Sequence, residues 1–318
     1  MIPEQELEKG LNRVDPPCPY YGECGGCQLQ HFDYPSQLIW KQRLLQSYLE
    51  TLVEPEKLRP MIGSPLQWNY RRRIQVHATP KGEPGFFATG SHHVVPIESC
   101  LIAQQPLNDA LPQVKEKWRN LLSKKDRPSL LTFELTRKDD GGVEMKPAGR
   151  ERFFLQINPE ANAVLVQHLR EIFAKVGPRE VLELYAGAGN FTYELYNPSL
   201  AWTSVESESG AFESGRARAQ SSKVRWVHDK AQNYLKKNTS RHWDLALMDP
   251  PREGGRGSIS LLVKTPVPCL AYISSSPAAL HRDLKALLAG GYEVRWVQGF
   301  DFFPHTNHIE SLVLLRHR

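Results

Sequence analysis

Four polar side chains in the C-terminal half follow predicted strands at the point where each strand ends. They are Glu206, Asp229, Asp249 and Ser275. In an open α/β sheet, ligands bind in the crevice outside the carboxyl ends of the strands. Each residue alone could be a cap or a turn former, but that explanation would have to hold four times. The sequence therefore predicts a ligand site at this sheet edge.

A glycine turn precedes this series in the stretch Val181–Thr192, which reads VLELYAGAGNFT. A buried strand is predicted first, and Gly187 and Gly189 then allow a tight turn into a helix that begins near Asn190. Thr192 stands where a dinucleotide fingerprint has its third glycine. Glu206, at the tip of the second strand, is placed to accept hydrogen bonds from ribose hydroxyls. The pattern favours S-adenosylmethionine over NAD, because no pyrophosphate has to be bound.

Three cysteines near the start, Cys18, Cys24 and Cys27, form a C-x5-C-x2-C run, and Cys100 is the remaining cysteine of this half. Such spacing lets one loop bring several thiolates to one centre. By spacing alone, a [4Fe–4S] cluster and a tetrahedral zinc ion fit equally well, and an unmetallated set is the third alternative. In each metal case, a link from Cys27 to Cys100 ties the first segment to the following β region.

A basic stretch, Trp68–His77, is predicted as a strand that carries Arg71, Arg72 and Arg73. Strand alternation sends Arg71 and Arg73 to one face. Together with neighbouring aromatic residues, these arginines could bind RNA phosphates and stack bases. Solvated arginines on an edge strand are the alternative.

The composition agrees with an enzyme that has a polyanionic partner, without requiring one. The chain has 318 residues and a formal net charge of +5, and its length suggests about two domains. No apolar run reaches transmembrane length, and MIPEQELEKG lacks a secretory core. We therefore expect a cytoplasmic protein with reduced cysteines and no membrane partner.

The elements predicted to position these residues form two domains. Residues 1–150 are expected to be an α+β domain, with an amphipathic helix over Pro35–Leu52 that leaves Lys41 and Arg43 off its apolar stripe, and with a hairpin at Asp139–Gly142. Residues 151–318 are expected to be a doubly wound, Rossmann-like α/β domain. Its predicted helix is Ala161–Ala174, and its predicted strands are Val181–Leu184, Ala201–Val205, Val224–His228, Trp243–Met248, Leu270–Ser274, Tyr292–Phe300 and Ile309–Leu315.

Asp249 opens the sequence D-P-P-R after an apolar strand. The prolines stiffen the loop and leave carbonyls and the Asp249 carboxylate facing the site. D-P-P also occurs where an exocyclic amine is methylated, although an aromatic residue usually follows there and Arg252 follows here. An amino-group methyltransferase is therefore one alternative function.

These stretches together resemble the RNA 5-methyluridine methyltransferases of the RumA/TrmA type, in the branch that carries an iron–sulfur cluster. The matching stretches run from Cys18 to Leu315: CPYYGECGGCQLQH, NYRRR, ESC, FLQIN, LELYAGAGNFT, DPPREG, ISSSPAALHRDL and FFPHTNHIESLVLL. The resemblance implies a [4Fe–4S] cluster on Cys18, Cys24, Cys27 and Cys100. It implies S-adenosylmethionine contacts from Gln156, Tyr185, Asn190, Glu206, Asp229 and Asp249. It also implies a folded RNA substrate, most directly ribosomal RNA, and no obligate protein partner. Some relatives carry an N-terminal RNA-binding barrel, for which the position of Cys18 leaves no room.

The family chemistry is covalent: a cysteine thiolate adds to C6 of uracil, C5 takes the methyl group, and a base then removes the C5 proton. Glu310 matches the base. Ser275 occupies the nucleophile position, and a hydroxyl needs a dedicated base to attack at all. The chain is then an inactive relative that binds cofactor and RNA, an engineered Cys-to-Ser form of an active enzyme, or an enzyme that needs no thiolate. Cys269 lies too far along its strand to replace Ser275 and is expected to be a small buried residue.

Overall fold

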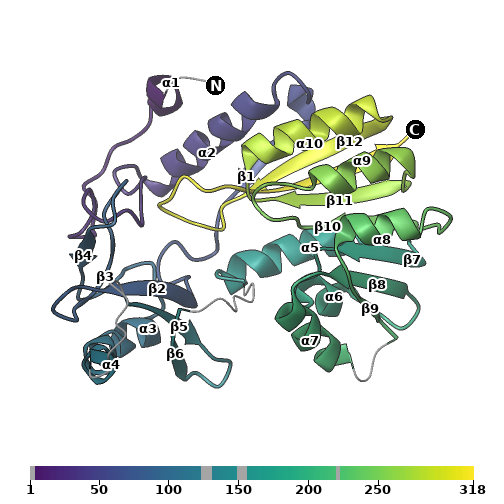
Figure 1. The fold of residues 1–318 in the computed structure, drawn as a ribbon. Helices are drawn as coiled ribbons and strands as arrows, with labels where there is room; N and C mark the ends of the chain where they lie inside the picture. Colours follow the sequence, from purple (N-terminus) through teal and green to yellow (C-terminus); the bar gives the residue numbers. More distant parts are fainter. Residues whose placement is uncertain (1–3, 123–130, 149–155, 220–222) are drawn as a thin grey trace.

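The computed structural model describes residues 4–122, 131–148, 156–219 and 223–318, which form two sheets with helices packed on them (Figure 1). The larger sheet has eight strands in the order β1-β12-β13-β11-β10-β7-β8-β9. All its neighbours are parallel except β13, which runs antiparallel to both β11 and β12. None of the described helices is long and apolar enough to span a bilayer.

The C-terminal part supplies seven strands of this sheet, with helices between most of them. The elements in chain order are α5 Pro159–Val176, β7 Glu180–Leu184, α6 Asn190–Leu195, β8 Ala201–Glu206, α7 Ser209–Arg218, β9 Arg225–His228, α8 Ala231–Lys237, β10 Leu245–Met248, α9 Arg256–Lys264, β11 Cys269–Ser274, α10 Pro277–Ala289, β12 Tyr292–Phe300 and β13 Glu310–His317. The alternation of strands and helices predicted for this region is confirmed, and β12 has its predicted bounds.

The N-terminal part contributes a five-stranded antiparallel sheet in the order β4-β3-β2-β5-β6. The elements of the N-terminal part, in chain order, are α1 Glu4–Glu8, α2 Tyr34–Leu49, the 3-10 helix η1 Pro55–Lys57, β1 Leu58–Ile62, β2 Arg73–Ala78, β3 Pro84–Phe87, β4 Val94–Pro96, α3 Gln105–Ala110, α4 Pro112–Leu122, β5 Thr132–Arg137 and β6 Val143–Pro147. Helices α3 and α4 cover one face of this sheet and share its apolar core. The predicted hairpin between β5 and β6 is confirmed.

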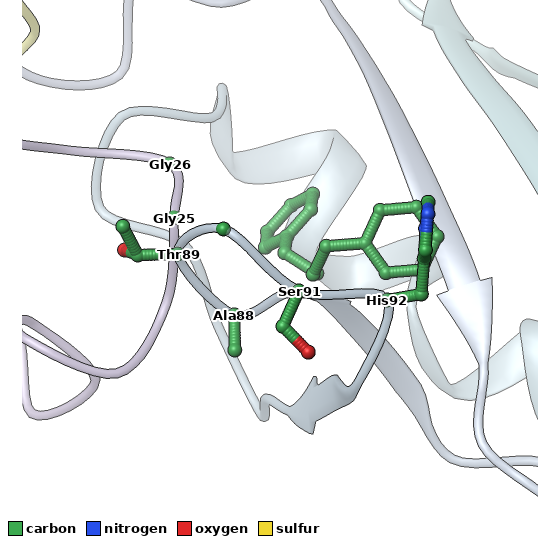
Figure 2. Close-up of a pocket in the computed structure, with 9 residues that line it drawn as sticks. Gly25, Gly26, Ala88, Thr89, Ser91 and His92 are labelled. Atoms are coloured by element: carbon green, nitrogen blue, oxygen red, sulfur yellow. The ribbon is translucent and has the colours of Figure 1, made fainter.

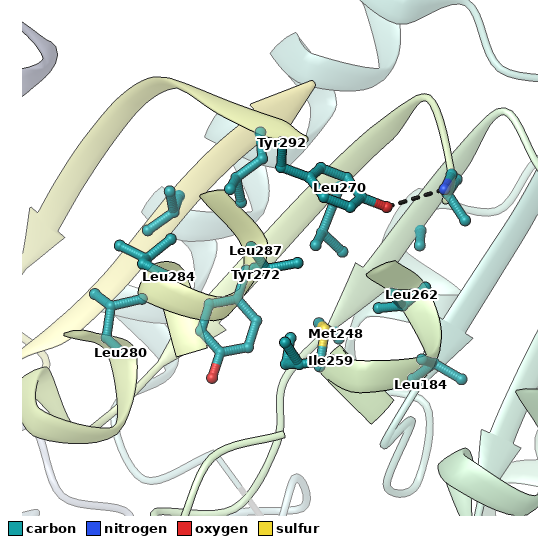
Figure 3. Close-up of a cluster of buried hydrophobic side chains, with 14 of the residues drawn as sticks. Leu184, Met248, Ile259, Leu262, Leu270, Tyr272, Leu280, Leu284, Leu287 and Tyr292 are labelled. Carbon is teal, nitrogen blue, oxygen red and sulfur yellow. Dashed lines mark hydrogen bonds between the residues drawn. The ribbon is translucent and has the colours of Figure 1, made fainter. Parts of the chain in front are cut away.

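Two apolar layers hold the large sheet, one on each face. The first joins β7, β10 and β11 to α2, α8, α9 and α10. Figure 3 shows part of it, with Leu184 and Met248 beneath α9 and with Tyr272 facing α10. The second layer joins the opposite face to α5 and α6. With both faces covered, the central strands are apolar throughout, as is typical of parallel sheets.

The N-terminal segment is not confined to its own domain. Strand β1 pairs in parallel with β12, and α2 packs against α10 and β1. The predicted division at residue 150 lies outside the described residues and stays a prediction, but Tyr34–Ile62 belongs structurally to the large sheet. The expectation for Lys41 was wrong: its side chain is fully buried and its Nζ pairs with Asp301 Oδ1 at 2.6 Å.

The strand predicted over Trp68–His77 was wrong in its first half, because β2 begins only at Arg73. Asn69 takes a left-handed backbone conformation with φ 53°, which interrupts an extended run. Arg71 instead exchanges backbone hydrogen bonds with the segment after Cys100, so it does not share a strand face with Arg73. The three arginines are consequently placed in different surroundings.

Candidate functional site

The glycine turn after β7 brings the backbone against Glu206. Tyr185, Gly187 and Gly189 all have positive φ angles, which makes the chain turn sharply into α6. The Gly187 amide donates to Glu206 Oε2 at 2.8 Å. Glu206 Oε1 accepts from the amides of Ser207 and Glu208, each at 2.7 Å. The carboxylate at the tip of β8 is therefore oriented by the backbone on both sides.

A chain of hydrogen-bonded side-chain amides lies at the start of α6. Asn190 and Asn162 exchange two side-chain hydrogen bonds, of 3.0 and 3.1 Å. Gln156 Nε2 donates to Asn162 Oδ1 at 3.4 Å. The structure thus brings together two residues that the sequence singled out, Gln156 and Asn190. The residue that connects them, Asn162, lies one turn into α5 and had no recognisable sequence signal.

Asp229 follows β9, and its amide donates to the Glu206 carbonyl at 3.1 Å. Its carboxylate accepts from Lys237 Nζ and from the Lys230 amide, each at 2.8 Å. The hydrogen bond from Lys237 is the main cause that lowers the pKa of Asp229. Asp229 is therefore an ionised group beside Glu206.

Asp249 and Glu310 form a buried acidic pair at the same edge. Asp249 follows β10, and burial raises its pKa to about 7. Glu310 opens β13; burial and then the charge of Asp249 raise its pKa, while Arg252 opposes the rise. Two nearby carboxylates in a dry site resist joint ionisation. At neutral pH the pair can therefore hold a proton, as a general acid or base must.

Ser275 lies directly after β11 and is half-buried. Ser274 pairs with Ser311 in the antiparallel β11–β13 ladder, so the next step of the register brings Ser275 opposite Glu310. Since β10 also pairs with β11, the residues predicted as nucleophile position, base and Asp249 lie on three neighbouring strands. Cys269 is at the opposite end of β11 and only 2% exposed, which confirms its expected structural role.

The loop after Asp249 is held from α10. Gly254 has φ 81°, and the Gly255 amide donates to Asp283 Oδ2 at 2.7 Å. The same oxygen accepts from the Tyr272 hydroxyl at 2.8 Å. Arg282 donates to the Glu253 carbonyl at 2.6 Å. Arg282 and Asp283 lie within the ISSSPAALHRDL stretch, but their support of the D-P-P-R loop was not predicted.

A second buried carboxylate was also missed. Glu183 in β7 accepts hydrogen bonds from Thr192, Trp202 and Ser204. Burial raises its pKa to about 7 despite these bonds. Because Thr192 lies in α6, this network fixes the helix that follows the glycine turn. Its only sequence signal is an acidic residue within an apolar strand.

Two histidines precede Glu310 in the loop after β12, and they have separate partners. Arg252 bonds His308 Nδ1 at 2.8 Å. His305 is buried, its ring stacks on Trp68 with centroids 3.6 Å apart, and its Nδ1 lies 3.1 Å from Gln37 Nε2. Burial lowers the pKa of both rings to about 4. Both are therefore neutral near pH 7, and His305 has the contacts of a buried structural residue.

The four N-terminal cysteines line one cavity of about 70 Å³ together with Arg71 and several apolar side chains. Each thiol is within electrostatic range of another, and burial raises the pKa of Cys27 to about 12. In the described part of the chain, no group of three or more His, Cys, Asp or Glu side chains is arranged to hold a metal ion.

A larger open cavity of about 530 Å³ adjoins the cysteine loop (Figure 2). It lies between Gly25–Gly26 and the hairpin that connects β3 to β4, where Phe87 packs edge-on against His92. The Gly25 amide donates to the Phe87 carbonyl at 2.9 Å, so the loop and hairpin are joined along this cavity.

The predicted RNA-contact arginines Arg72 and Arg73 are both engaged with carboxylates. Arg72 pairs with the exposed Asp139 at 2.8 Å, and Arg73 pairs with Glu134 at 2.5 Å. Arg71 has a different position, in the wall of the cysteine cavity. The basic stretch is therefore not one continuous surface.

The comparisons with known proteins agree with this geometry. The fold is similar to a solved Pyrococcus abyssi tRNA (uracil-54, C5)-methyltransferase in complex with S-adenosyl-L-homocysteine: the TM-score is 0.71 and the identity 22%, with 92% of this chain and 86% of that chain covered. The large sheet thus has the class I methyltransferase-like fold.

The sequence is 30% identical to the 23S rRNA (uracil(1939)-C(5))-methyltransferase RlmD of Chromohalobacter salexigens, over 98% of this chain and 78% of the relative. It is 29% identical to RlmD of Haemophilus parainfluenzae, over 97% and 84%. The family model described as tRNA (Uracil-5-)-methyltransferase matches residues 230–318. The chain therefore belongs to the RNA uracil-C5 methyltransferase family, and by this resemblance it is an RNA methyltransferase.

Proposed function

We propose that this protein binds S-adenosylmethionine and acts on C5 of a uridine in RNA, most directly ribosomal RNA. The observation that carries the proposal is the placement of Asp249, Ser275 and Glu310 at the ends of the adjacent strands β10, β11 and β13, with β7, its glycine turn and Glu206 next to β10. The relatives named for 23S rRNA support the ribosomal substrate. A cytoplasmic location fits such a substrate.

Gln156, Tyr185, Asn190, Glu206 and Asp229 are the residues proposed to hold the cofactor. When bound, S-adenosylmethionine supplies an electrophilic methyl group on a sulfonium. The ionised Asp229 places negative charge at the same edge, which suits a cationic ligand. A uridine would have to leave its base stack to reach this buried edge.

Glu310 is the proposed base that takes the C5 proton. Its raised pKa, shared with Asp249, suits proton transfer near neutrality. Ser275 is half-buried opposite Glu310 but carries a hydroxyl in place of a thiol. In this arrangement Glu310 would have to activate the nucleophile and also remove the C5 proton, which are two separate tasks. We therefore expect the chain as it stands to be poorly competent in methyl transfer.

The proposed [4Fe–4S] cluster is supported by the donor set of the cysteine cavity. Four thiols line one cavity, and a cubane cluster takes one thiolate on each of four irons. The neighbouring Arg71 supplies positive charge for an anionic group. We assign the cluster an architectural role, because methyl transfer moves no net electrons. Anaerobic purification with iron and sulfide analysis tests this part.

The function is tested by incubating the protein with isotopically labelled S-adenosylmethionine and unmodified ribosomal RNA, followed by mass spectrometry of the nucleosides. The wild-type chain, the Ser275→Cys variant and a matched Ser275→Ala variant are compared. We expect labelled 5-methyluridine from the Ser275→Cys variant and none from Ser275→Ala. Labelled methyladenine or methylcytosine would instead identify an amino-group methyltransferase.

A second candidate function is favoured by Ser275 itself: a protein that binds cofactor and RNA without turnover. It predicts that the wild-type chain takes up S-adenosylhomocysteine in calorimetry and retains RNA, yet yields no methylated nucleoside. If the Ser275→Cys variant also binds both ligands and yields no product, the loss of function extends beyond the nucleophile, and this second function replaces the first.

A further inference from the structure

Arg71 is fixed at the boundary between the cysteine cavity and the loop that leads to Glu310. Its backbone amide donates to the Ile102 carbonyl and its carbonyl accepts from the Gln104 amide, each at 2.9 Å. These partners come directly after Cys100, whose own amide is held by Asn108 Oδ1 at 2.8 Å. Arg71 and Cys100 are therefore attached to the same short segment.

Among the described residues, the guanidinium of Arg71 has no carboxylate partner, whereas Arg72 and Arg73 each have one. Its Nε is buried and has no hydrogen-bond partner among the described residues. Its charge lies 6.0 Å from the ring centroid of Tyr70 and 5.7 Å from that of Phe303. Arg72 and Arg73, by contrast, each reach a carboxylate.

A buried charge is costly unless an opposite charge or a set of hydrogen bonds compensates it. Aromatic faces attract a guanidinium only by about 0.5–2 kcal/mol, which is too little to replace a counter-ion. The polar neighbours of the Arg71 guanidinium are the Tyr70 hydroxyl and the thiols of Cys24, Cys27 and Cys100. The hydroxyl is uncharged near pH 7, so the cation has only thiols as possible counter-charges in the cavity that it lines.

We infer that Arg71 provides the positive counter-charge of the iron–sulfur cluster and does not contact RNA phosphates. The inference rests on the proposed cluster. Four thiolates give the cluster a net negative charge, and reduction by one electron makes that charge larger. A fixed cation in the cavity wall stabilises the reduced form more than the oxidised form, so it raises the reduction potential. Net charge and hydrogen bonds to the sulfurs are known to set such potentials.

The same contact has a second consequence for cluster retention. Without Arg71, the thiolates would be buried beside apolar side chains with no compensating charge, which favours their protonation and the release of iron. Arg71→Lys keeps a positive charge but loses the planar fork of donors. We therefore expect that variant to retain part of the effect.

The test compares Arg71→Met and Arg71→Lys with matched Arg72→Met and Arg73→Met controls, all purified anaerobically. Iron and sulfide content, the rate of bleaching in air, and the midpoint potential in a dithionite titration are measured. Arg71→Met should bleach at least several-fold faster and have a lower potential, with Arg71→Lys intermediate and both controls like the wild type. Calorimetry with S-adenosylhomocysteine verifies that each variant has folded at the distant sheet edge.

Two different results would overturn the inference. Wild-type protein that retains no iron overturns the cluster proposal and this inference together. An Arg71→Met variant with full iron content and unchanged potential overturns this inference alone. Should that variant also bind RNA more weakly than Arg72→Met and Arg73→Met, the role of Arg71 is that of a phosphate contact. If Arg71→Met fails to fold, the Arg71→Lys variant provides the test. A bleaching rate and a midpoint potential equal to those of the wild type in Arg71→Lys would contradict the role of the guanidinium.

Discussion

The sheet edge and the cysteine cavity bury ionisable groups in opposite ways. At the edge, Asp249 and Glu310 are like charges, and their pKa values are raised. The cavity is lined by four thiols and by Arg71, a cation without a carboxylate partner among the described residues. The first arrangement suits a cationic ligand and a mobile proton, whereas the second suits a permanently anionic group. One region is thus organised for chemistry and the other for holding a structural centre.

The two regions are joined by the loop between β12 and β13, residues 301–309. The His305 carbonyl accepts from the amides of Gln28 and Leu29, directly after Cys27, each at 2.9 Å. Asp301, at the start of the same loop, pairs with Lys41. Since this loop ends at Glu310, the position of the proposed base depends on the packing of the cysteine loop.

The largest effect is expected at the acidic edge. In a Ser275→Cys background, Glu310→Gln should lower the methylation rate by about 10²–10⁴-fold, as expected when a general base is removed. Single-turnover assays with labelled cofactor measure it. A matched Glu194→Gln variant, in an exposed pair with Arg170, should leave the rate unchanged. A loss of less than tenfold for Glu310→Gln would exclude Glu310 as the base.

The next effect concerns the connection between the two regions. Lys41→Met removes one partner of a fully buried pair and leaves Asp301 as an uncompensated charge, so the free energy of unfolding should fall by about 3–5 kcal/mol. Urea denaturation measures it. Lys57→Met, in a more exposed pair with Glu54, should cost only about 0–1 kcal/mol. The double variant Lys41→Met/Asp301→Leu should recover most of the loss; no recovery would show that packing, and not charge, is responsible.

Prediction from the sequence succeeded where a topological rule applies. Parallel strands present their carboxyl ends at one edge, so the positions of Glu206, Asp229, Asp249 and Ser275 in the chain were enough to place them at the same edge of the sheet. The rule needs only the order of strands and helices, and the apolar runs determine that order. The observed ladders from β7 to β11 agree with it.

Prediction failed where a residue's surroundings come from segments far apart in the chain. Lys41 was assigned to the polar side of its helix, but it is buried because Asp301, 260 residues later, lies against it. Arg71 was grouped with two arginines that it does not accompany. The supporting roles of Asn162 and Asp283 could not be predicted, because each role depends on which loop packs beside the residue.

A smaller effect is expected at the cofactor turn. Glu206→Gln keeps an acceptor for the Gly187 amide but removes the charge. A hydrogen bond to a charged group contributes about 1.5–3 kcal/mol, so S-adenosylhomocysteine should bind roughly ten- to a hundredfold more weakly in calorimetry. Glu208→Gln, two residues on at the cap of α7, is the control and should change the affinity little. Equal affinity of both variants would remove Glu206 from the proposed ribose contact.

The last effect is a pH dependence of stability that has opposite signs at two carboxylates of the same edge. The folded-state pKa of Asp249 is raised from 3.8 to about 7, so the folded chain keeps a proton that the unfolded chain releases. Its contribution to stability is therefore full below about pH 4 and is lost as the pH rises toward 7, at no more than about 1.4 kcal/mol per pH unit. The pKa of Asp229 is lowered, so its contribution is present above its unfolded pKa and is lost as the pH falls.

Because His305 and His308 also titrate in this range, the informative quantity is the difference in the free energy of unfolding between each variant and the wild type. Relative to wild type, Asp249→Asn should gain stability as the pH rises from 5 to 7, whereas Asp229→Asn should show its deficit shrink only below pH 4. Parallel curves for both variants would mean that the two carboxylates share one environment, and the contrast between a protonated pair and an ionised neighbour at this edge would be wrong.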